Sequence, residues 1–467
     1  MNGPLGITIQ TAMRLAYFLP VAAVTILSLT GGPSIAAAVS FVKDVAPILA
    51  AKCVTCHGPE KSKGHYRLDT FEALLKPGES EKKPIVASQP EQSHLWQLLT
   101  TKDADDRMPQ KDDPLPAATI ALIRRWIQEG ASFDGSEQKA SLSSLLAPAA
   151  HPEAPIRYAR PVPVLAVALG RDGAEVFAGG YHEVTVWNST NGVLLRRIKN
   201  IPQQVRSLAM SPDGRTLALA GGAPGRSGEV KLIDIASGTI TRTLVTTPDM
   251  MLALAFSPDG QRLACGGTDN SIRVFNVAGG KQELRVEAHA DWVLDVAFSH
   301  DGKFMASASR DKTARILELK SGESEQTYAG HGEPVFTVAF TADDKRVLST
   351  ARDRELHLWS VSEAKKLGEA GGFEGEALRL LVFGTKAFTA GADGRVRQFS
   401  VGEKKPEPLA LLEGHRDAVY GLAFHEPSHR LVSSSYDGEV RVWDTESGQL
   451  VTNWLAAPGY PATLAKP

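Results

Sequence analysis

Two thiols and one imidazole lie within five residues, in the run Cys53-Val54-Thr55-Cys56-His57. In a C-x-x-C-H sequence the two thiols can each bond a vinyl group of one porphyrin, and the histidine that follows can reach the iron. Two other interpretations compete: a dithiol redox site needs a strand-rich context, and half a zinc site needs two further ligands. The spacing therefore predicts one covalently attached haem c, bound through Cys53 and Cys56, with His57 as an axial ligand of the iron.

The second axial ligand is expected downstream of the motif. Met108 lies in Arg107-Met108-Pro109, within a polar stretch where core packing gives little reason for a methionine. A thioether is a soft ligand that can occupy the iron position opposite the histidine. We therefore predict Met108 as the second ligand, with His65 and His94 as the alternatives.

Helices must position these residues, because the apolar side chains from Phe41 to about Gly135 recur at helical spacing. Pro47 is tolerated only in a first helical turn, so regular helix is expected from about Asp44 to Cys53. A second amphipathic helix is expected near Trp126. The spacing is seen at Phe41, Val45, Ile48 and Leu49, and again at Ile120, Ile123, Trp126 and Ile127.

This segment resembles the planctomycete-type cytochrome c domain over about Phe41 to Asp134. The resemblance is carried by the haem motif with Gly58 and by the runs Phe41 to Leu49, Arg67-Leu68-Asp69, Ser93 with Leu95, Met108-Pro109, Trp126-Ile127 and Gly130-Ala131. It implies that His57 and Met108 are the iron ligands. Gln110 stands where that family usually has a second proline, and Pro84 to Ser88 lacks a common Pro-Gly, which affects the expected loop shape.

The N-terminal 40 residues have the pattern of a targeting segment. Arg14 precedes an apolar run from Leu15 to Leu29, and Ala36 and Ala38 have the small side chains of a cleavage site. The run is shorter than the ~20 residues that a membrane-spanning helix needs. A signal peptide cleaved after Ala38 or Ser40 is expected, with an uncleaved anchor as the alternative, and either places the protein in the periplasm or cell envelope.

From about Arg160 the apolar pattern alternates, and one unit recurs seven times. First turns fall at residues 172, 213, 259, 301, 343, 384 and 426, and third strands end at Trp187, Ile233, Phe275, Leu317, Trp359, Phe399 and Trp443. A single small sheet cannot bury both of its faces, so such units stack, and a closed ring protects their edges. The glycine-rich run Gly221 to Gly225 is interpreted as a loop insertion in one unit.

These repeats resemble the WD-repeat family, which has Gly-His near the start and Trp-Asp near the end of each repeat. The best copy is Gly414-His415 with Asp437 and Trp443-Asp444, and the next is Gly330-His331 with Asp353 and Trp359; Ala288-His289 with Asp311 is a weaker one. The resemblance implies four-stranded blades. Because polar groups inside a sheet must be paired, we expect a structural hydrogen-bonded network rather than a catalytic site. Its members are His331, Asp353, Trp359, His415, Asp437 and Trp443.

The expected fold is therefore multidomain: a small all-α cytochrome c domain followed by an all-β seven-bladed propeller. The boundaries are 1–40 for the signal peptide or anchor, 41–135 for the cytochrome domain, 136–159 for the linker, 160–457 for the propeller and 458–467 for a tail. The fourth strand of the last blade is expected near Leu450 to Leu455, with the segment from Ile156 to Tyr158 as an alternative closure of the ring.

Composition and motif content argue against several classes of function. A formal net charge of -2 makes nucleic acid a poor candidate partner, because binding to a phosphate backbone requires a basic protein surface. With three cysteines, of which Cys265 has no neighbour in sequence, a disulfide framework is excluded, and Cys265 is expected to be a buried structural thiol. No nucleotide-binding or hydrolase motif is found.

The leading hypothesis is electron transfer by an exported mono-haem c-type cytochrome, not an enzyme, whose propeller docks a redox or envelope protein. The alternative is an interaction scaffold whose haem senses redox state or a gas, and a peroxidase-type enzyme, which needs an open iron position, is less favoured. Membrane contact is expected only if the N-terminal segment is uncleaved.

Overall fold

The structure is a computed structural model that describes residues 38–59, 61–110, 113–135, 137–145 and 151–460. The predicted apolar run of the targeting segment, Leu15 to Leu29, lies outside the described residues. Within the described ranges, none of the helices is long and apolar enough to span a membrane.

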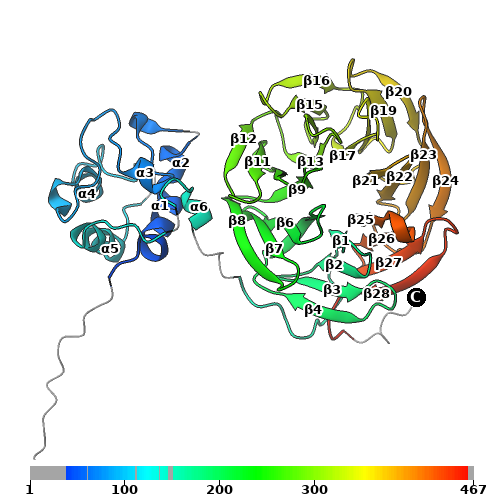
Figure 1. Ribbon diagram of the computed structural model, residues 1–467, viewed down its shortest axis with the longest axis horizontal. Coiled ribbons are helices and arrows are strands. Elements are labelled where there is room, and N and C mark those ends of the chain that lie inside the picture. The colour runs from blue at the N-terminus through cyan, green and yellow to red at the C-terminus, as the bar shows by residue number, and fades with distance from the viewer. Residues whose placement is uncertain (1–37, 60, 111–112, 136, 146–150, 461–467) are drawn as a thin grey trace, which may run out of the picture. The chain divides into compact units, whose positions relative to one another are not determined.

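The first part of the chain is helical (Figure 1). Its elements are η1 (Phe41–Val45), α1 (Ala46–Lys52), α2 (Val54–His57), η2 (Lys63–His65), α3 (Phe71–Leu74), η3 (Pro90–Gln92), α4 (His94–Thr100), α5 (Ala117–Gln128) and α6 (Leu142–Leu145).

Helix begins earlier at the N-terminal end than the sequence predicts. Ser40 is the N-cap of η1, and its hydroxyl accepts a hydrogen bond from the backbone N–H of Lys43, which satisfies a donor that a helix start leaves free. Pro47 stands in the first turn of α1, where its missing N–H costs no hydrogen bond. The helical path continues through Cys53 into α2, so the haem motif occupies a single short helical turn.

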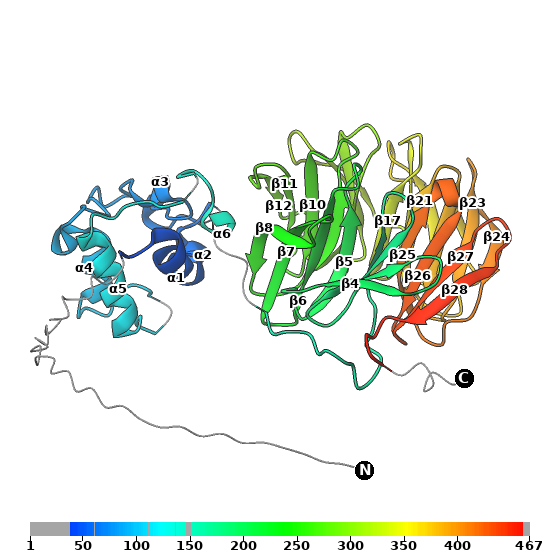
Figure 2. The same ribbon diagram turned by 60° about the horizontal axis from the view of Figure 1, so that its bottom comes forward.

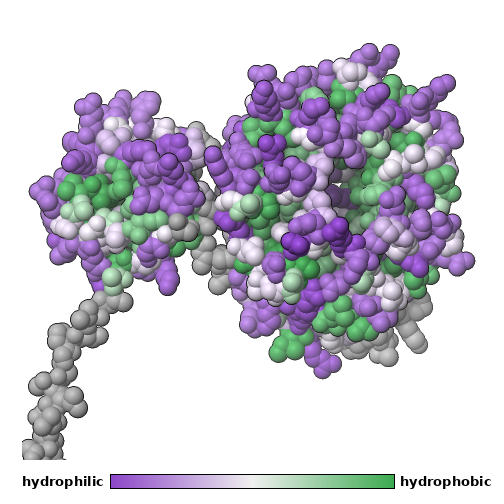
Figure 3. Space-filling model, viewed as in Figure 1, coloured by the Kyte–Doolittle hydropathy of each residue, from purple (hydrophilic) through white to green (hydrophobic). Residues whose placement is uncertain are grey.

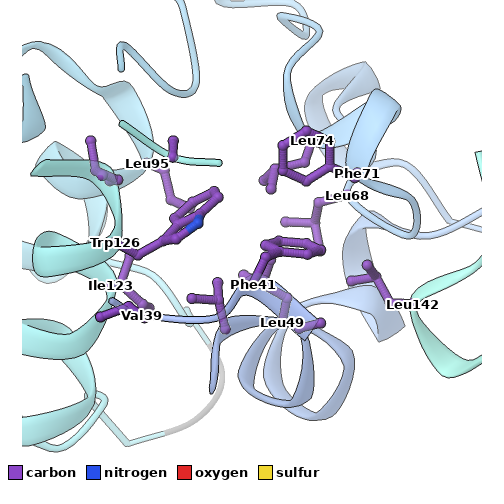
Figure 4. Close-up of a cluster of buried hydrophobic side chains, with 14 of the residues drawn as sticks. Val39, Phe41, Leu49, Leu68, Phe71, Leu74, Leu95, Ile123, Trp126 and Leu142 are labelled. Carbon is purple, nitrogen blue, oxygen red and sulfur yellow. The ribbon is translucent and has the colours of Figure 1, made fainter. Parts of the chain in front are cut away.

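An aromatic cluster forms the core of the helical domain (Figure 4). The Phe41 and Phe71 rings meet edge to face, with ring centroids 4.8 Å apart, and the centroids of the Trp126 and Phe41 rings lie 5.4 Å apart. Trp126 is fully buried, and its indole N–H donates to the Ser132 carbonyl oxygen, so burial leaves no polar group unpaired. This core packs η1, which continues through α1 into the haem motif, against α5.

The helical core also takes in part of the segment that the sequence assigns to the linker. Leu142 of α6 is 1% exposed in this core, and its N–H donates to the Asp69 carbonyl oxygen. Sequence periodicity did not reveal α6, because a four-residue helix is too short to repeat its apolar position.

The second part of the chain is a ring of seven four-stranded antiparallel sheets (Figures 1 and 2). In chain order the blades are β1 (Val167–Leu169), β2 (Glu175–Gly179), β3 (Val184–Asn188), β4 (Leu194–Ile198); β5 (Gln204–Met210), β6 (Thr216–Ala223), β7 (Ser227–Asp234), β8 (Thr239–Thr247); β9 (Met251–Phe256), β10 (Arg262–Gly267), β11 (Ile272–Asn276), β12 (Gln282–Val286); β13 (Val293–Phe298), β14 (Phe304–Ser309), β15 (Ala314–Glu318), β16 (Ser324–Tyr328); β17 (Val335–Phe340), β18 (Arg346–Ala351), β19 (Leu356–Ser360), β20 (Lys366–Ala370); β21 (Ala377–Phe383), β22 (Lys386–Gly391), β23 (Val396–Val401), β24 (Pro406–Leu412); and β25 (Val419–His425), β26 (Arg430–Ser435), β27 (Glu439–Asp444), β28 (Leu450–Leu455). The small helical region and the seven-bladed propeller are the fold that the sequence predicted.

Neighbouring blades bury apolar side chains between them, which is why one blade alone is not a folding unit. The first and last blades share a cluster in which Val167 and Val176 pack with Val432 and Val442, and this contact closes the ring. The fourth strand of the last blade is β28, as expected. Ile156, from the alternative closing segment, is instead 86% exposed.

One detail of the second blade differs from the sequence interpretation. Gly221, Gly222 and Ala223 lie within β6 and pair with β7, so the glycine-rich run lengthens a hairpin and is not a loop insertion. Only the turn at its tip, which includes Gly225 with φ of +64°, has the left-handed backbone that favours glycine.

Candidate functional site

The residues of the haem motif line one cavity of about 610 Å³ in the helical domain. Cys53, Cys56 and His57 contribute to its wall, and so does Met108, which the chain places 51 residues further on. This volume falls in the range of sites that enclose a small organic ligand. The structure therefore brings the predicted attachment residues and both predicted iron ligands to the same cavity.

The His57 imidazole is oriented by the backbone. Its Nδ1 lies 3.2 Å from the Tyr66 carbonyl oxygen, and the Leu68 N–H donates to the His57 carbonyl oxygen. Tyr66 is fixed in turn, because its hydroxyl donates to the Leu74 carbonyl oxygen at 3.0 Å. A histidine whose Nδ1–H donates to a carbonyl keeps the lone pair on Nε2, the arrangement that histidine ligands of metals usually have.

The two alternatives to Met108 differ in position. His94, at the start of α4, also lines the cavity. His65 is exposed and does not line it. Met108 is half-buried, and its N–H donates to the carbonyl oxygen of Leu98, which is another residue of the cavity wall. Met108 and His94 therefore remain candidates for the second iron ligand, and the position of His65 argues against it.

The remaining cavity wall suits a porphyrin. Buried and partly buried leucines supply an apolar surface for the flat macrocycle, while lysines at the wall supply positive charge for its propionate carboxylates. The leucines are Leu68, Leu95, Leu98 and Leu99, and the lysines are Lys52, Lys63 and Lys82. Together with the two cysteines and His57, these residues fit a haem c.

The competing interpretations of the two cysteines find no support. Burial, with the neighbouring Cys56 thiol, raises the pKa of Cys53 to about 11, whereas redox-active dithiols use a lowered pKa. Among the described residues, the clusters of three or more His, Cys, Asp or Glu that could share a metal ion all lie in the propeller. Cys265 is fully buried in the third blade, as expected.

In the fifth blade, the predicted propeller residues form a chain of hydrogen bonds. His331 Nδ1 lies 2.6 Å from an Asp353 carboxylate oxygen, and His331 Nε2 lies 2.8 Å from the Ser349 hydroxyl oxygen. The Trp359 indole N–H donates to the same hydroxyl at 3.1 Å. Sequence reasoning missed Ser349, although a serine also follows the histidine by 18 residues in the fourth and seventh blades, at Ser307 and Ser433.

The copies of this network are not identical. In the seventh blade His415 and Trp443 both bond Ser433, but His415 Nδ1 lies 3.8 Å from Asp437, too far for a hydrogen bond. In the fourth blade His289 bonds both Asp311 and Ser307, while Leu317 occupies the tryptophan position.

Two classes of domain are therefore defined by fold and site. The helical domain, with a C-x-x-C-H motif opening into an apolar cavity, is a cytochrome c-type domain, and the ring of seven blades is a WD-repeat propeller. The chain carries a planctomycete cytochrome c domain: the family model described as Planctomycete cytochrome C matches residues 53–112. The model described as WD domain, G-beta repeat matches residues 238–276, 280–317, 322–360 and 406–444.

Several curated proteins are similar to this chain over short stretches. Mouse Striatin-4 (Mus musculus) is 41% identical over 69 residues, which is 13% of this chain and 9% of that protein. The Target of rapamycin complex subunit LST8 of Saccharomyces cerevisiae is 36% identical over 59 residues, 13% of this chain and 20% of that protein. The 66 kDa stress protein of Physarum polycephalum is 32% identical over 97 residues, 21% of this chain and 16% of that protein. The chain thus covers a fifth or less of the length of each of these relatives.

Proposed function

We propose that this protein is an exported mono-haem c-type cytochrome that transfers electrons, and that its propeller docks the redox or envelope protein with which it exchanges them. The observation that carries the proposal is that Cys53, Cys56, His57 and Met108 all line one cavity. Export to the periplasm or cell envelope is supported by the apolar run from Leu15 to Leu29 and the small residues Ala36 and Ala38.

Each residue has a separate task in this proposal. Cys53 and Cys56 hold the cofactor covalently, and His57, oriented by the Tyr66 carbonyl, presents Nε2 to the iron. Met108 presents a soft thioether, which favours the ferrous state and raises the reduction potential. The bound haem supplies one-electron chemistry. With both axial positions filled by the chain, no position is left for a substrate, which favours electron transfer over an enzyme.

Carbon monoxide distinguishes the proposal from its alternatives. The purified full chain should retain haem absorption after denaturation and precipitation in acidified acetone, because thioether bonds survive that treatment. The reduced native protein should bind carbon monoxide slowly and weakly. Rapid, tight binding would show an open iron position and would favour the gas sensor or the peroxidase-type enzyme, and loss of haem on denaturation would refute covalent attachment.

The channel of the propeller is the surface we propose for docking. In blades two to seven the innermost strand carries a β-bulge, and the bulged residue is partly exposed in each. These residues are Arg206, Leu252, Leu294, Phe336, Leu378 and Tyr420. A bulge re-aims its side chain, and here it does so at the same place in six blades, on the strands that contact one another around the inside of the ring. Figure 3 shows a hollow at the centre of this ring.

This ring of bulged residues has the composition of a protein-binding surface. Four of its members are apolar, and they stand beside one tyrosine and one arginine, which are residue types enriched at interfaces. Within the described part of the chain, the Arg206 guanidinium has neither a hydrogen bond nor an ion pair, and burial lowers its pKa. A partner segment that brings a carboxylate among apolar side chains would satisfy it.

A further inference from the structure

A histidine and two glutamates meet at the two outer strands of the fifth blade, β19 and β20 (Figure 1), with one of the glutamates, Glu355, directly before β19. His357 of β19 pairs directly with Glu369 of β20. Glu355 precedes His357 by two residues, and its carboxylate lies against the His357 ring. Strand register therefore brings Glu369 to His357, and the chain directly before β19 brings Glu355.

The atoms of this cluster are close and differ in exposure. His357 Nε2 lies 2.6 Å from a Glu355 carboxylate oxygen and 3.8 Å from a Glu369 carboxylate oxygen. The His357 side chain is 1% exposed, whereas those of Glu355 and Glu369 are 41% and 48% exposed. One ligand atom from each residue lies within 4.8 Å of the others. A fixed imidazole nitrogen thus faces two movable carboxylates at the protein surface.

The other blades show what is unusual here. The position of His357 is occupied by a lysine or an arginine in five other blades, namely Lys231, Arg273, Arg315, Arg397 and Arg441. In two of these blades that cation forms an ion pair with a glutamate at the position of Glu355: Lys231 with Glu229, and Arg441 with Glu439. Among the seven described blades, only the fifth has an acidic residue, Glu369, at the outer-strand position that pairs directly with this one. The cluster therefore combines an imidazole, in place of a lysine or arginine, with a second carboxylate that faces it.

The far side of His357 is arranged as metal-bound histidines usually are. Its Nδ1 lies 2.8 Å from the hydroxyl of Tyr328, which is 2% exposed and stacked on Trp359. The His331 ring lies parallel to that of His357, with centroids 3.8 Å apart. An outer partner that fixes the imidazole ring and its tautomer is typical of a histidine ligand. Here the Tyr328 hydroxyl can accept a hydrogen bond from Nδ1–H, which leaves the Nε2 lone pair for a metal ion, and the stacked His331 ring fixes the plane.

We propose that Glu355, His357 and Glu369 bind a divalent transition-metal ion, of which Zn²⁺ is the best match. One imidazole with two carboxylates is a ligand set that zinc accepts, with water in the fourth position. Bonds of about 2.0–2.1 Å require ligand atoms about 3.4 Å apart, so the exposed Glu355 and Glu369 carboxylates need only small shifts. Lys366, whose ammonium lies 2.5 Å from the Glu369 carboxylate, neutralises part of the charge and competes with the metal.

The experiment is calorimetric titration of the haem-loaded full chain with Zn²⁺ alone, accompanied by metal analysis after dialysis. The wild-type protein should bind one equivalent that Glu369→Gln and His357→Gln do not bind. Lys366→Met should bind the same equivalent more tightly, because the competing cation is removed. Tyr328→Phe should weaken the affinity about 10- to 100-fold, which is the usual effect of losing an outer partner.

The control is Glu407→Gln, which removes an exposed carboxylate from the outer strand of the sixth blade and should leave the titration unchanged. Because His357 is buried and its variant can misfold, the decisive comparison is between Glu369→Gln and Lys366→Met, both of which alter exposed side chains. Equal Zn²⁺ binding by wild type and Glu369→Gln would overturn the proposal, and so would weaker binding by Lys366→Met.

Discussion

His57 Nδ1 lies 3.2 Å from the Tyr66 carbonyl oxygen, on the far side of the imidazole from the nitrogen that is left for iron. A backbone acceptor cannot be removed by substitution, so this ring orientation is secured by the fold. Within the described residues no hydrogen bond reaches the Met108 sulfur; its backbone N–H donates to the Leu98 carbonyl oxygen, and the residue packs against the helical core. The two predicted ligands therefore differ in how a substitution should affect them.

We expect Met108→Ala to open one iron position without releasing the haem, because Cys53 and Cys56 still hold it. The ferric parent protein should show the weak far-red charge-transfer band of methionine ligation, and the variant should lack it. His94→Ala and His65→Ala are the controls, and both should keep the band. If the parent protein lacks the band, Met108 is not the ligand. A change in the ferric haem spectrum of His94→Ala relative to the parent would then identify His94 as the ligand.

The N-terminus of the mature protein is expected at Val39. Val39 is buried in the helical core, and its backbone nitrogen lies 2.7 Å from a Glu129 carboxylate oxygen. Cleavage after Ala38 keeps this residue and the Ser40 cap of η1, and it turns the Val39 nitrogen into an ammonium that pairs with Glu129. Cleavage after Ser40 would remove both. Mass spectrometry of the exported protein decides, and a terminus at Phe41 or an intact Met1 would contradict this prediction.

The hydrogen-bonded networks of the blades predict that a Ser→Ala substitution lowers the free energy of unfolding by different amounts in different blades. Ser349→Ala and Ser433→Ala each remove the hydroxyl that a histidine and a tryptophan share, so each leaves two buried groups without their partner. Ser307→Ala leaves only His289 without one. At about 1–3 kcal/mol for each unsatisfied group, the first two variants should lower the free energy of unfolding more than the third. Urea unfolding followed by tryptophan fluorescence measures this, and three equal losses would show that the tryptophan N–H contributes nothing.

The sequence predicted the propeller well because its signals are local and repeated. Turns such as Asp259-Gly260 and strand ends such as Trp443 recur with one period, and each repeat checks the others. The cytochrome motif is also local, since Cys53 and His57 share a helical turn. What the sequence could not decide depends on contacts between distant residues. Leu142 is buried only because α6 returns to the helical core, and Glu369 lies opposite His357 only through strand register.

The choice of second iron ligand shows the same limit. Polar surroundings in sequence favoured Met108, but they could not separate His65 from His94, because spacing along a loop does not say which side chain reaches a cavity. The structure separates them, since only His94 lines the wall. The serines of the blade networks were missed for another reason: serine is common in strands, and only the constant interval of 18 residues from each histidine marks Ser307, Ser349 and Ser433.

The last prediction concerns acid stability of the fourth blade. Burial opposes ionisation of Asp311, but hydrogen bonds from His289, Thr313 and the Ala290 N–H outweigh it and hold the pKa of Asp311 well below its usual value. A carboxyl whose pKa is lower in the folded protein than in the unfolded chain, where it is about 4, stabilises the fold above that pH. That contribution is lost as the pH falls toward the folded-state pKa.

Asp311→Asn should therefore lower the free energy of unfolding by about 1–3 kcal/mol at pH 7. The difference from wild type should shrink when urea unfolding is repeated below about pH 4, because the wild-type carboxylate then becomes protonated as the chain unfolds. A difference that stays constant between pH 7 and pH 3 would show that the charge on Asp311 does not stabilise this blade.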